Sequence, residues 1–325
     1  MTNKEVAELA GVSSAAVSRF LNGGYLSQEK RERIAAAIEE TGYVPSANAR
    51  ILRTKKSDTI GVILTKTDEN AMSGVVSGLE KYFFAGDYGT SLTYVGDDSK
   101  EQAKTMRSLL ERQIDGIVLV SSAPVPGDIS LYERARVPVV VVGQHVRDMS
   151  CVRFDNFGAA YDLASSLNCA PESHVAYIDV KGKYRSFGSD RRKGFIAGLE
   201  RCGVDAESIK VCATDFTVDG GYRIATDLLA DSRGYDYISC ATDTIAAGVI
   251  KAIRERHGSI SSPRAPRVSG FGDDAILQAV AGPIPSVRFD YEECGIKAAE
   301  IMVDQLKDRT KLAVSLVLGY QVVGV

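Results

Sequence analysis

The sequence predicts an α/β protein in which a short helical unit precedes a larger region of doubly wound parallel sheets. From Thr59 onward, continuous apolar runs such as 60–64 and 116–120 alternate with segments whose apolar residues recur at helical spacing. Strands buried on both faces produce such runs, and their alternation with helices is typical of parallel sheets. Before Thr59, the clearest apolar spacing is that of short helices.

Length and composition exclude several classes of protein. At about 100–200 residues per domain, 325 residues suggest two or three compact units. A hydrophobic content of 45% with 25% charged residues excludes collagen-like, coiled-coil and wholly disordered chains. No apolar run approaches the ~18–20 residues of a membrane span, and the polar residues 1–5 do not begin a signal peptide. We therefore expect a cytoplasmic protein.

Neither a metal site nor a catalytic site is predicted. The six cysteines form no C-x-x-C pair, so reduced thiols are expected, and the three histidines lie far from one another. The run 270–275 is a G-x-G-x-x-A, but it lacks the helix, strand and acidic residue that follow in a dinucleotide site. The run 74–78 only approximates a nucleophile elbow and has helical spacing. We expect no enzyme and no cofactor.

The net charge of −3 is distributed unevenly along the chain. Residues 1–58 hold nine Lys or Arg and seven Asp or Glu, whereas the remainder holds 30 and 35. Arg50, Arg53, Lys55 and Lys56 cluster at the end of the first segment. The asymmetry suggests a short basic module attached to a larger acidic one.

Three short helices are predicted in the first segment. Gly11 ends the first because glycine tolerates the left-handed conformation of a helix end, and Ser13 is a favourable N-cap for the second. The third runs from about 28 to 41, between Ser27 and Gly42. The pattern predicts a helix-turn-helix, with a helical cap on the larger domain as the alternative. The spaced apolar residues are Val6, Leu9, Ala10, Val17, Phe20, Leu21, Ile34, Ala35 and Ile38.

These N-terminal motifs resemble those of a known family. The runs V-A-E-L-A-G-V-S-S-A-A-V-S-R-F-L-N-G, S-Q-E-K-R-E-R-I and T-G-Y-V-P-S-A-N-A-R-I-L-R-T are similar to the DNA-binding headpiece and hinge helix of LacI/GalR bacterial transcriptional repressors. The resemblance extends along nearly the whole chain. It implies a headpiece over 1–56, with a hinge helix at about 46–54, and an effector-binding and dimerisation core over 59–325.

The resemblance also implies which residues contact double-stranded DNA. Ser14, Ala15 and Arg19 match recognition-helix positions that contact base edges, and Arg19 suits a bidentate contact to guanine. Ala49 and Leu52 match hinge residues that enter the minor groove, where an apolar wedge kinks the duplex. A solvated linker residue is the alternative for Leu52. The positions that match phosphate contacts are Thr2, Ser13, Ser18 and Asn22.

The core is expected to contain two lobes, because about 265 residues are more than a domain built on a single sheet usually contains. Helical spacing recurs over 72–79 and 246–253. The resemblance implies a core like a periplasmic sugar-binding protein, with three chain crossings and a ligand cleft outside the carboxyl ends of the strands. Further strands are expected at 137–142, 175–179, 209–213, 237–241, 268–271 and 314–323. The first lobe is expected to hold 59–157 and 291–313, and the second 158–290 and 314–325.

Effector-binding residues are implied mainly by the resemblance. Arg191, in R-R-K-G-F, matches the family arginine that reaches the effector, and its planar fork suits vicinal hydroxyls, a carboxylate or a phosphate. The alternative for each candidate is an ion pair or hydrogen bond that shapes the hinge. Gly272 occupies the first of two positions that are often acidic in the family. The ligand contact that an acidic residue would make at this position is therefore in doubt, or is made by Asp273 instead. The other candidates are Phe216, Asp155, Asp273, Asn70, Thr65 and Gln144.

These features predict a sequence-specific repressor of carbohydrate-utilisation genes. A sugar or sugar-phosphate effector would shift the balance of open and closed cores, and with it the affinity for a palindromic operator. The runs V-V-V-V-G-Q and P-S-V-R-F-D-Y-E-E-C-G are similar to those of sucrose and oligosaccharide operon repressors. A free sugar-binding transport protein would need an export signal, and an enzyme on this fold would need a catalytic constellation.

A homodimer is expected because one helix-turn-helix reads only half of a palindrome. The helix from about residue 71 has more apolar residues than one buried stripe needs, although two of them could simply pack under the first sheet. No leucine-rich helix follows the strand-like 314–323, so no stable tetramer is expected. The residues concerned are Met72, Val76, Phe83 and Phe84.

Overall fold

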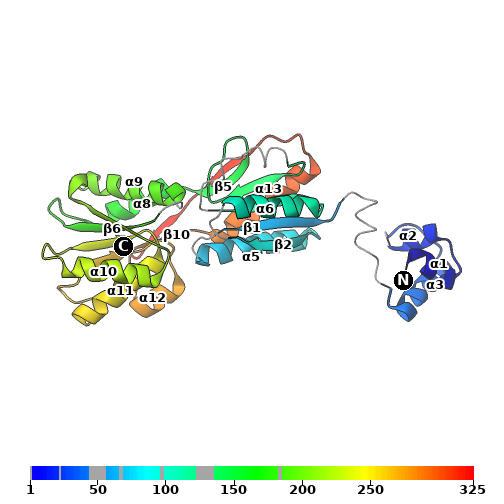
Figure 1. The fold of residues 1–325 in the computed structure, drawn as a ribbon, viewed down its shortest axis with the longest axis horizontal. Coiled ribbons are helices and arrows are strands. Elements are labelled where there is room, and N and C mark those ends of the chain that lie inside the picture. The colour runs from blue at the N-terminus through cyan, green and yellow to red at the C-terminus, as the bar shows by residue number, and fades with distance from the viewer. Residues whose placement is uncertain are drawn as a thin grey trace. The chain divides into compact units, whose positions relative to one another are not determined.

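The computed structural model of the chain describes residues 2–21, 23–43, 56–65, 69–95, 99–121, 135–181 and 185–325. The chain divides into two compact units, a helical unit over 1–57 and a core over 58–325 (Figure 1). The expected hinge helix at about 46–54, with Ala49 and Leu52, lies outside the described residues.

Three helices form the N-terminal unit, as predicted: α1 (Asn3–Ala10), α2 (Ser14–Leu21) and α3 (Gln28–Thr41). Thr2 and Glu5 form a capping box at the start of α1. Gly11 and Gly42 end α1 and α3 with φ near 59°, the left-handed conformation that glycine adopts without strain. The mini-core that holds the three helices together comprises Val6, Ala7, Ala10, Ala16, Val17, Leu26, Ile34 and Ala37.

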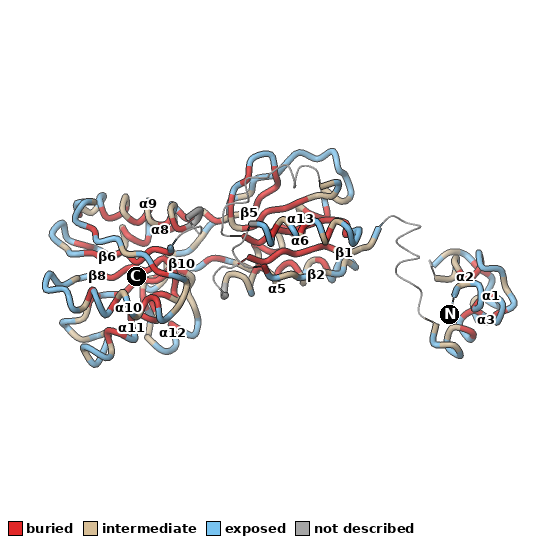
Figure 2. The backbone as a smooth tube through the Cα atoms, in the orientation of Figure 1, coloured by how far each residue is buried: buried red, intermediate tan, exposed pale blue. Residues whose placement is uncertain are grey.

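The first lobe of the core is a six-stranded sheet in which every pair of neighbours is parallel. Its strands, in order across the sheet, are β11 (Ser315–Leu318), β5 (Ser150–Phe154), β4 (Val139–Val142), β3 (Gly116–Val120), β1 (Thr59–Leu64) and β2 (Gly89–Tyr94). Helices α5 (Glu69–Ala85) and α13 (Tyr291–Lys307) pack on one face and α6 (Ser99–Glu111) on the other. The central strands are buried along their length (Figure 2).

The second lobe is a four-stranded parallel sheet between two layers of helices. The strand order is β7 (Lys210–Thr214), β6 (Val175–Val180), β8 (Tyr237–Cys240) and β9 (Arg267–Ser269). Figure 1 shows α8 (Asn156–Ser166) and α9 (Arg185–Arg201) on one side of this sheet, with α10 (Val218–Ala230) and α11 (Asp243–His257) on the other. A short helix, α12 (Ala275–Ala281), follows β9.

The last chain crossing differs from the expected position at residue 314. Strand β11 pairs with β5 in the first lobe, and only β12 (Gln321–Val323) joins the second lobe, antiparallel to β10 (Ser286–Arg288). The reason is the open edge of β5, whose backbone groups need a ladder partner, and Ser315–Leu318 supplies it. Residues 314–318 therefore belong to the first lobe.

The helices that flank the sheets cross closely through glycines. A Cβ on Gly248 of α11 would overlap the Val218 carbonyl oxygen of α10. A Cβ on Gly78 of α5 would overlap the Glu292 carbonyl oxygen of α13 in the same way. Each of these helix pairs has room for hydrogen but not for a methyl group. Within the described ranges, no helix is long and apolar enough to cross a membrane.

We predict that Gly248→Ala destabilises the core by about 1–3 kcal/mol, because the added methyl forces α10 and α11 apart. Urea unfolding measures the change, and Arg256→Ala on an exposed position of the same helix is the control, expected within about 0.5 kcal/mol of the wild type. Equal stability of the two variants would contradict the close crossing.

Candidate functional site

Helix α2 presents a polar face to solvent. Ser14, Ala15 and Arg19 are exposed, whereas Ala16 and Val17 are buried in the mini-core. The amphipathic spacing therefore turns the three residues expected to contact bases away from the other two helices. A helix that displays such a face has the form that enters a DNA major groove.

Two of the four residues expected to contact phosphates, Thr2 and Ser13, lie at the starts of α1 and α2. The Thr2 hydroxyl accepts a hydrogen bond from the Glu5 amide at 3.3 Å, and the Ser13 hydroxyl accepts one from the Ala16 amide at 3.3 Å. Ser18 is half-buried on α2. Asn22 lies outside the described residues. Anions bind favourably at helix N-termini, so Thr2 and Ser13 stand where phosphates are stabilised.

Arg191 is a buried cation that joins three elements of the second lobe. Its Nε donates to Asn156 Oδ1 of α8 at 2.8 Å, and its Nη1 donates to the Ala241 carbonyl after β8 at 2.7 Å. The guanidinium also lies over the Phe271 ring, 4.1 Å from the centroid. These hydrogen bonds join elements within the second lobe, and both the hinge-shaping alternative and the effector contact stay predictions.

A pocket of about 330 Å³ opens at the carboxyl ends of β4 and β5. It lies next to Arg191, because Asn156 both lines it and accepts the Arg191 hydrogen bond. Residues of both lobes line it: Gly143, Gln144, His145, Arg153 and Phe154 from the first, Asn156 and Asp190 from the second. Asn156 was expected in the first lobe, but it begins α8, which packs on α9 of the second. Parallel strands place ligand sites at this edge of their sheets.

Two first-lobe candidates meet through Ser121. The Thr65 hydroxyl donates to Ser121 Oγ at 3.2 Å, and Gln144 Nε2 donates to the Ser121 carbonyl at 3.3 Å. These residues follow β1, β3 and β4, so the parallel sheet brings three strand ends together as the sequence suggested. Asn70 lies in the first turn of α5.

The two acidic candidates carry structural hydrogen bonds. Asp155 caps α8 by accepting from the Gly158 amide at 2.9 Å. Asp273 pairs with Arg288 at 2.6 Å, and its backbone has φ of 51°. Both residues therefore have a structural partner, while the alternative that these bonds shape the hinge stays a prediction. Phe216 is half-buried after β7 and packs against the core.

Asp243 is a buried acid that sequence reasoning missed. Its carboxylate accepts from the Ser286 hydroxyl at 3.0 Å and from the Asp274 amide at 2.6 Å. It therefore holds the loop after β9 against β10. The signal that could have found it is T-D-T-I directly after the buried run 237–241, where a polar strand end starts a helix.

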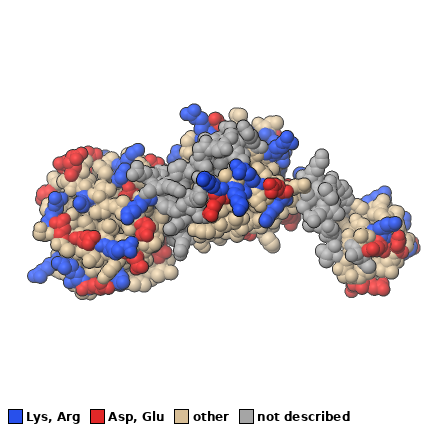
Figure 3. Space-filling model, in the orientation of Figure 1, with Lys and Arg blue, Asp and Glu red and all other residues tan. Residues whose placement is uncertain are grey.

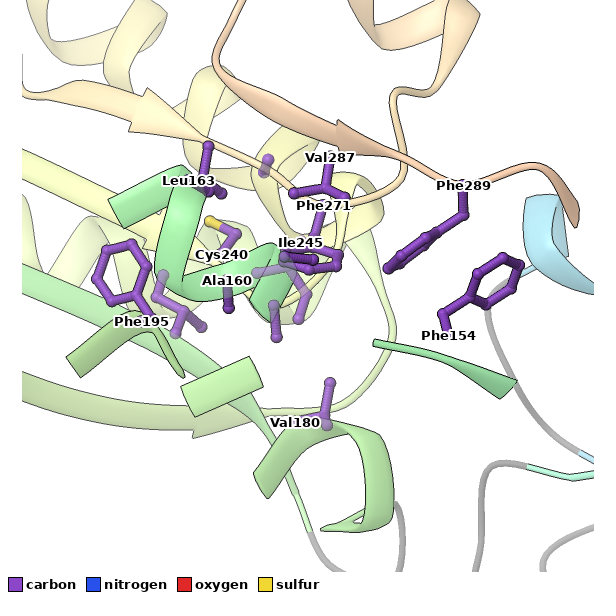
Figure 4. Packing of buried hydrophobic residues seen from close by; sticks show 14 of the residues in the cluster. Phe154, Ala160, Leu163, Val180, Phe195, Cys240, Ile245, Phe271, Val287 and Phe289 are labelled. Atoms are coloured by element: carbon purple, nitrogen blue, oxygen red, sulfur yellow. The ribbon is translucent and has the colours of Figure 1, made fainter. Parts of the chain in front are cut away.

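Aromatic rings line the chain crossings between the lobes (Figure 4). The Phe154 and Phe289 rings stack with centroids 4.3 Å apart, and Phe271 lies 5.6 Å from Phe289. Tyr291 packs edge-on against Phe154 at 5.5 Å. The crossing strands are thus joined by apolar packing.

Burial shifts two ionisable groups of the second lobe, Cys240 and Tyr177. It raises the pKa of the Cys240 thiol and, together with the nearby Asp179 carboxylate, that of the Tyr177 hydroxyl. Both shifts favour the uncharged form. No cluster of His, Cys, Asp and Glu able to hold a metal ion occurs among the residues that the structure describes.

Two family models match the chain. Residues 57–318 match the periplasmic binding proteins and sugar-binding domain of the LacI family. Residues 2–46 match the bacterial regulatory proteins of the lacI family. The boundary between the matches agrees with the division into a helical unit and a core.

Curated relatives and solved structures are similar over nearly the whole length. The sucrose operon repressor of Staphylococcus xylosus is 26% identical, covering 91% of each chain, and the ribose operon repressor of Haemophilus influenzae is 26% identical, covering 98% and 95%. A lac repressor dimer bound to operator is 20% identical with a TM-score of 0.86, covering 99% and 97%. A transcriptional regulator CelR–cellobiose complex is 26% identical with a TM-score of 0.71, covering 99% and 98%.

We predict that Arg191→Met destabilises the core by about 1–3 kcal/mol or more, because the Asn156 and Ala241 oxygens lose a buried donor. Lys193→Met changes an exposed residue of the same helix and is expected to stay within about 0.5 kcal/mol. Chemical unfolding of both variants decides the question. If Arg191→Met is as stable as Lys193→Met, the guanidinium does not hold the three elements together.

Proposed function

Since the chain belongs to the LacI family of bacterial regulatory proteins, we propose that it represses carbohydrate-utilisation genes in the cytoplasm under control of a sugar or sugar phosphate. It is a DNA-binding transcriptional regulator and not an enzyme. The observation that carries the proposal is the combination, on one chain, of an exposed α2 face with a pocket lined by both core lobes.

Recognition of the operator falls to Ser14, Ala15 and Arg19. Arg19 offers two parallel donors to guanine, and Ala15 offers apolar contact to a thymine methyl. Thr2 and Ser13, at helix starts, hold phosphates and fix the orientation of α2. The operator is palindromic in this scheme because each helical unit reads one half-site.

Control by the effector follows from the position of the pocket. A ligand that contacts Gln144 of the first lobe and Asn156 of the second favours one arrangement of the lobes over the other. Only such differential binding shifts the population of forms, and with it the operator affinity. Arg191 is hydrogen-bonded both to Asn156 and to the Ala241 carbonyl that follows β8. A ligand that moves Asn156 therefore acts on the end of β8 through Arg191.

The dimer interface of this proposal is an apolar groove of about 480 Å³ between α11 and α12. Val218, Ile276 and Val280 line it and are 42%, 76% and 63% exposed. We place a second copy of the chain in this groove, because the lac repressor, which has a similar fold, is a dimer. On α5, Phe83 is fully buried under the first sheet, whereas Phe84 is 84% exposed and stays available to the partner.

We predict that Arg19→Ala weakens operator binding by about 1–3 kcal/mol and relaxes preference at one base pair per half-site. Selection from random-sequence DNA followed by gel-shift titration measures both effects. Lys30→Ala removes the same charge from α3 and retains the sequence preference. An unchanged preference in Arg19→Ala would remove this residue from the base contacts.

We predict that a panel of sucrose, ribose, cellobiose and their phosphates contains a ligand that raises the melting temperature and changes operator affinity. At 100 times its Kd the ligand adds about 2.7 kcal/mol of stability. Gln144→Ala loses one hydrogen bond to it and binds roughly 3–10-fold more weakly. Gln321→Ala, exposed on β12, is the matched control. Equal affinities would place the ligand elsewhere.

We predict that Ile276→Asp converts the dimer to a monomer, because a carboxylate cannot be buried in an apolar interface without a partner. Sedimentation then gives 34.9 kDa in place of about twice that mass. Leu312→Asp, at a residue 87% exposed on the first lobe, remains dimeric. A dimeric Ile276→Asp would exclude the α11–α12 groove.

A further inference from the structure

Arg153 is the charged residue of β5, a strand whose other residues are all buried. On β5 its neighbours Val152 and Phe154 are buried in the core, and Cys151 lies on the opposite side in the second cluster. The buried Arg153 Nε has no hydrogen-bond partner among the residues that the structure describes. Among the described residues, no carboxylate lies within ion-pair distance of its guanidinium. A buried donor without an acceptor is costly, so the Nε of this side chain is left unsatisfied in this form of the core.

Asp190 is the acidic residue that lines the same pocket from the other lobe. It is exposed on α9, and within the described part of the chain it forms no ion pair. Its neighbours are already engaged, since Arg191 is hydrogen-bonded to Asn156 and Arg192 pairs with Asp179 at 3.3 Å. The pocket therefore holds one cation from the first lobe and one anion from the second, and neither has an ion-pair partner in the described part of the chain.

Neither of the other two groups near Arg153 that could carry a charge is paired with its guanidinium. His145, which also lines the pocket, has its Nδ1 3.5 Å from the Ser315 hydroxyl. Asp155, two residues along the chain, caps α8 through Gly158. Elsewhere on the core, charges of both signs are interspersed over the second lobe (Figure 3). Arg153 and Asp190 differ from these surface charges because they line one pocket from opposite lobes.

We propose that Arg153 and Asp190 form an ion pair across the pocket when the lobes close, and that this pair stabilises the closed form. Closure shortens the distance between the two charges and removes water from the pocket, and both changes strengthen the attraction of the pair. Both residues act as positioning residues for the lobes. The inference rests on the closure invoked in the proposed function, but its test needs neither operator nor effector.

The test is zero-length cross-linking of the full chain. Arg153→Lys keeps the charge and supplies an amine, which a water-soluble carbodiimide joins as an amide to a carboxylate in direct contact. Mass spectrometry of the digest is expected to show a link between positions 153 and 190. The Lys81–Glu292 pair, 2.7 Å apart, is the internal positive control, and Arg153→Lys with Asp190→Asn is the negative control. The yield falls as salt rises from about 0.05 to 0.5 M, since ions screen the approach.

A second measurement, of overall compactness, does not require a lysine at position 153 to lie in reach of the Asp190 carboxylate. Arg153→Asp and Asp190→Arg each place like charges across the pocket and are expected to enlarge the radius of gyration in small-angle X-ray scattering. The double variant restores the opposite charges and returns the radius toward that of the wild type. Circular dichroism verifies that each variant is folded.

The proposal is overturned if the Lys81–Glu292 link forms without a 153–190 link, or if the double variant is no more compact than the single ones. In either case, an intact thermal shift of the wild type with a sugar would leave the proposed effector function standing. Loss of that response in the wild type would count against the effector function instead.

Discussion

The buried guanidinium of Arg191 is the interaction on which the arrangement of the site depends. A permanently charged group can be buried only where acceptors and ring faces replace its water. Asn156, the Ala241 carbonyl and the Phe271 ring supply them from α8, the end of β8 and the loop after β9. Helix α9 cannot shift without breaking these contacts, so the start of α8, the pocket wall and the crossing aromatic rings are positioned together.

The separation of DNA reading from ligand binding has a physical basis in the two compact units. The helical unit has its own mini-core and helix caps. The exposed face of α2 is therefore positioned by residues of the helical unit alone. The core has its own sheets and pocket. Control of DNA binding by a ligand therefore requires that the core exist in forms of different operator affinity, whose populations the ligand shifts.

Local chemistry made part of the fold predictable. The ends of α1 and α3 were predicted because Gly11 and Gly42 are unambiguous stops, and the central strands because they are uniformly apolar. Strand β2 was not predicted, since an edge strand carries polar residues along its length. The last crossing was misplaced because the apolar run 314–323 shows where strands occur but not which sheet each joins. For the same reason, Arg153 and Asp190 were missed: their pocket is assembled from lobes that are distant in the sequence.

The placement of β11 determines the order in which the core can be completed as the chain emerges from the ribosome. The four-stranded sheet of the second lobe is complete at Ser269, whereas the six-stranded sheet waits for Ser315–Leu318 and for the α13 face that covers it. Until then, apolar strands translated much earlier remain partly uncovered, which makes them targets for chaperones and for aggregation. The lobe whose synthesis begins first therefore cannot complete its sheet until residue 318 has been added.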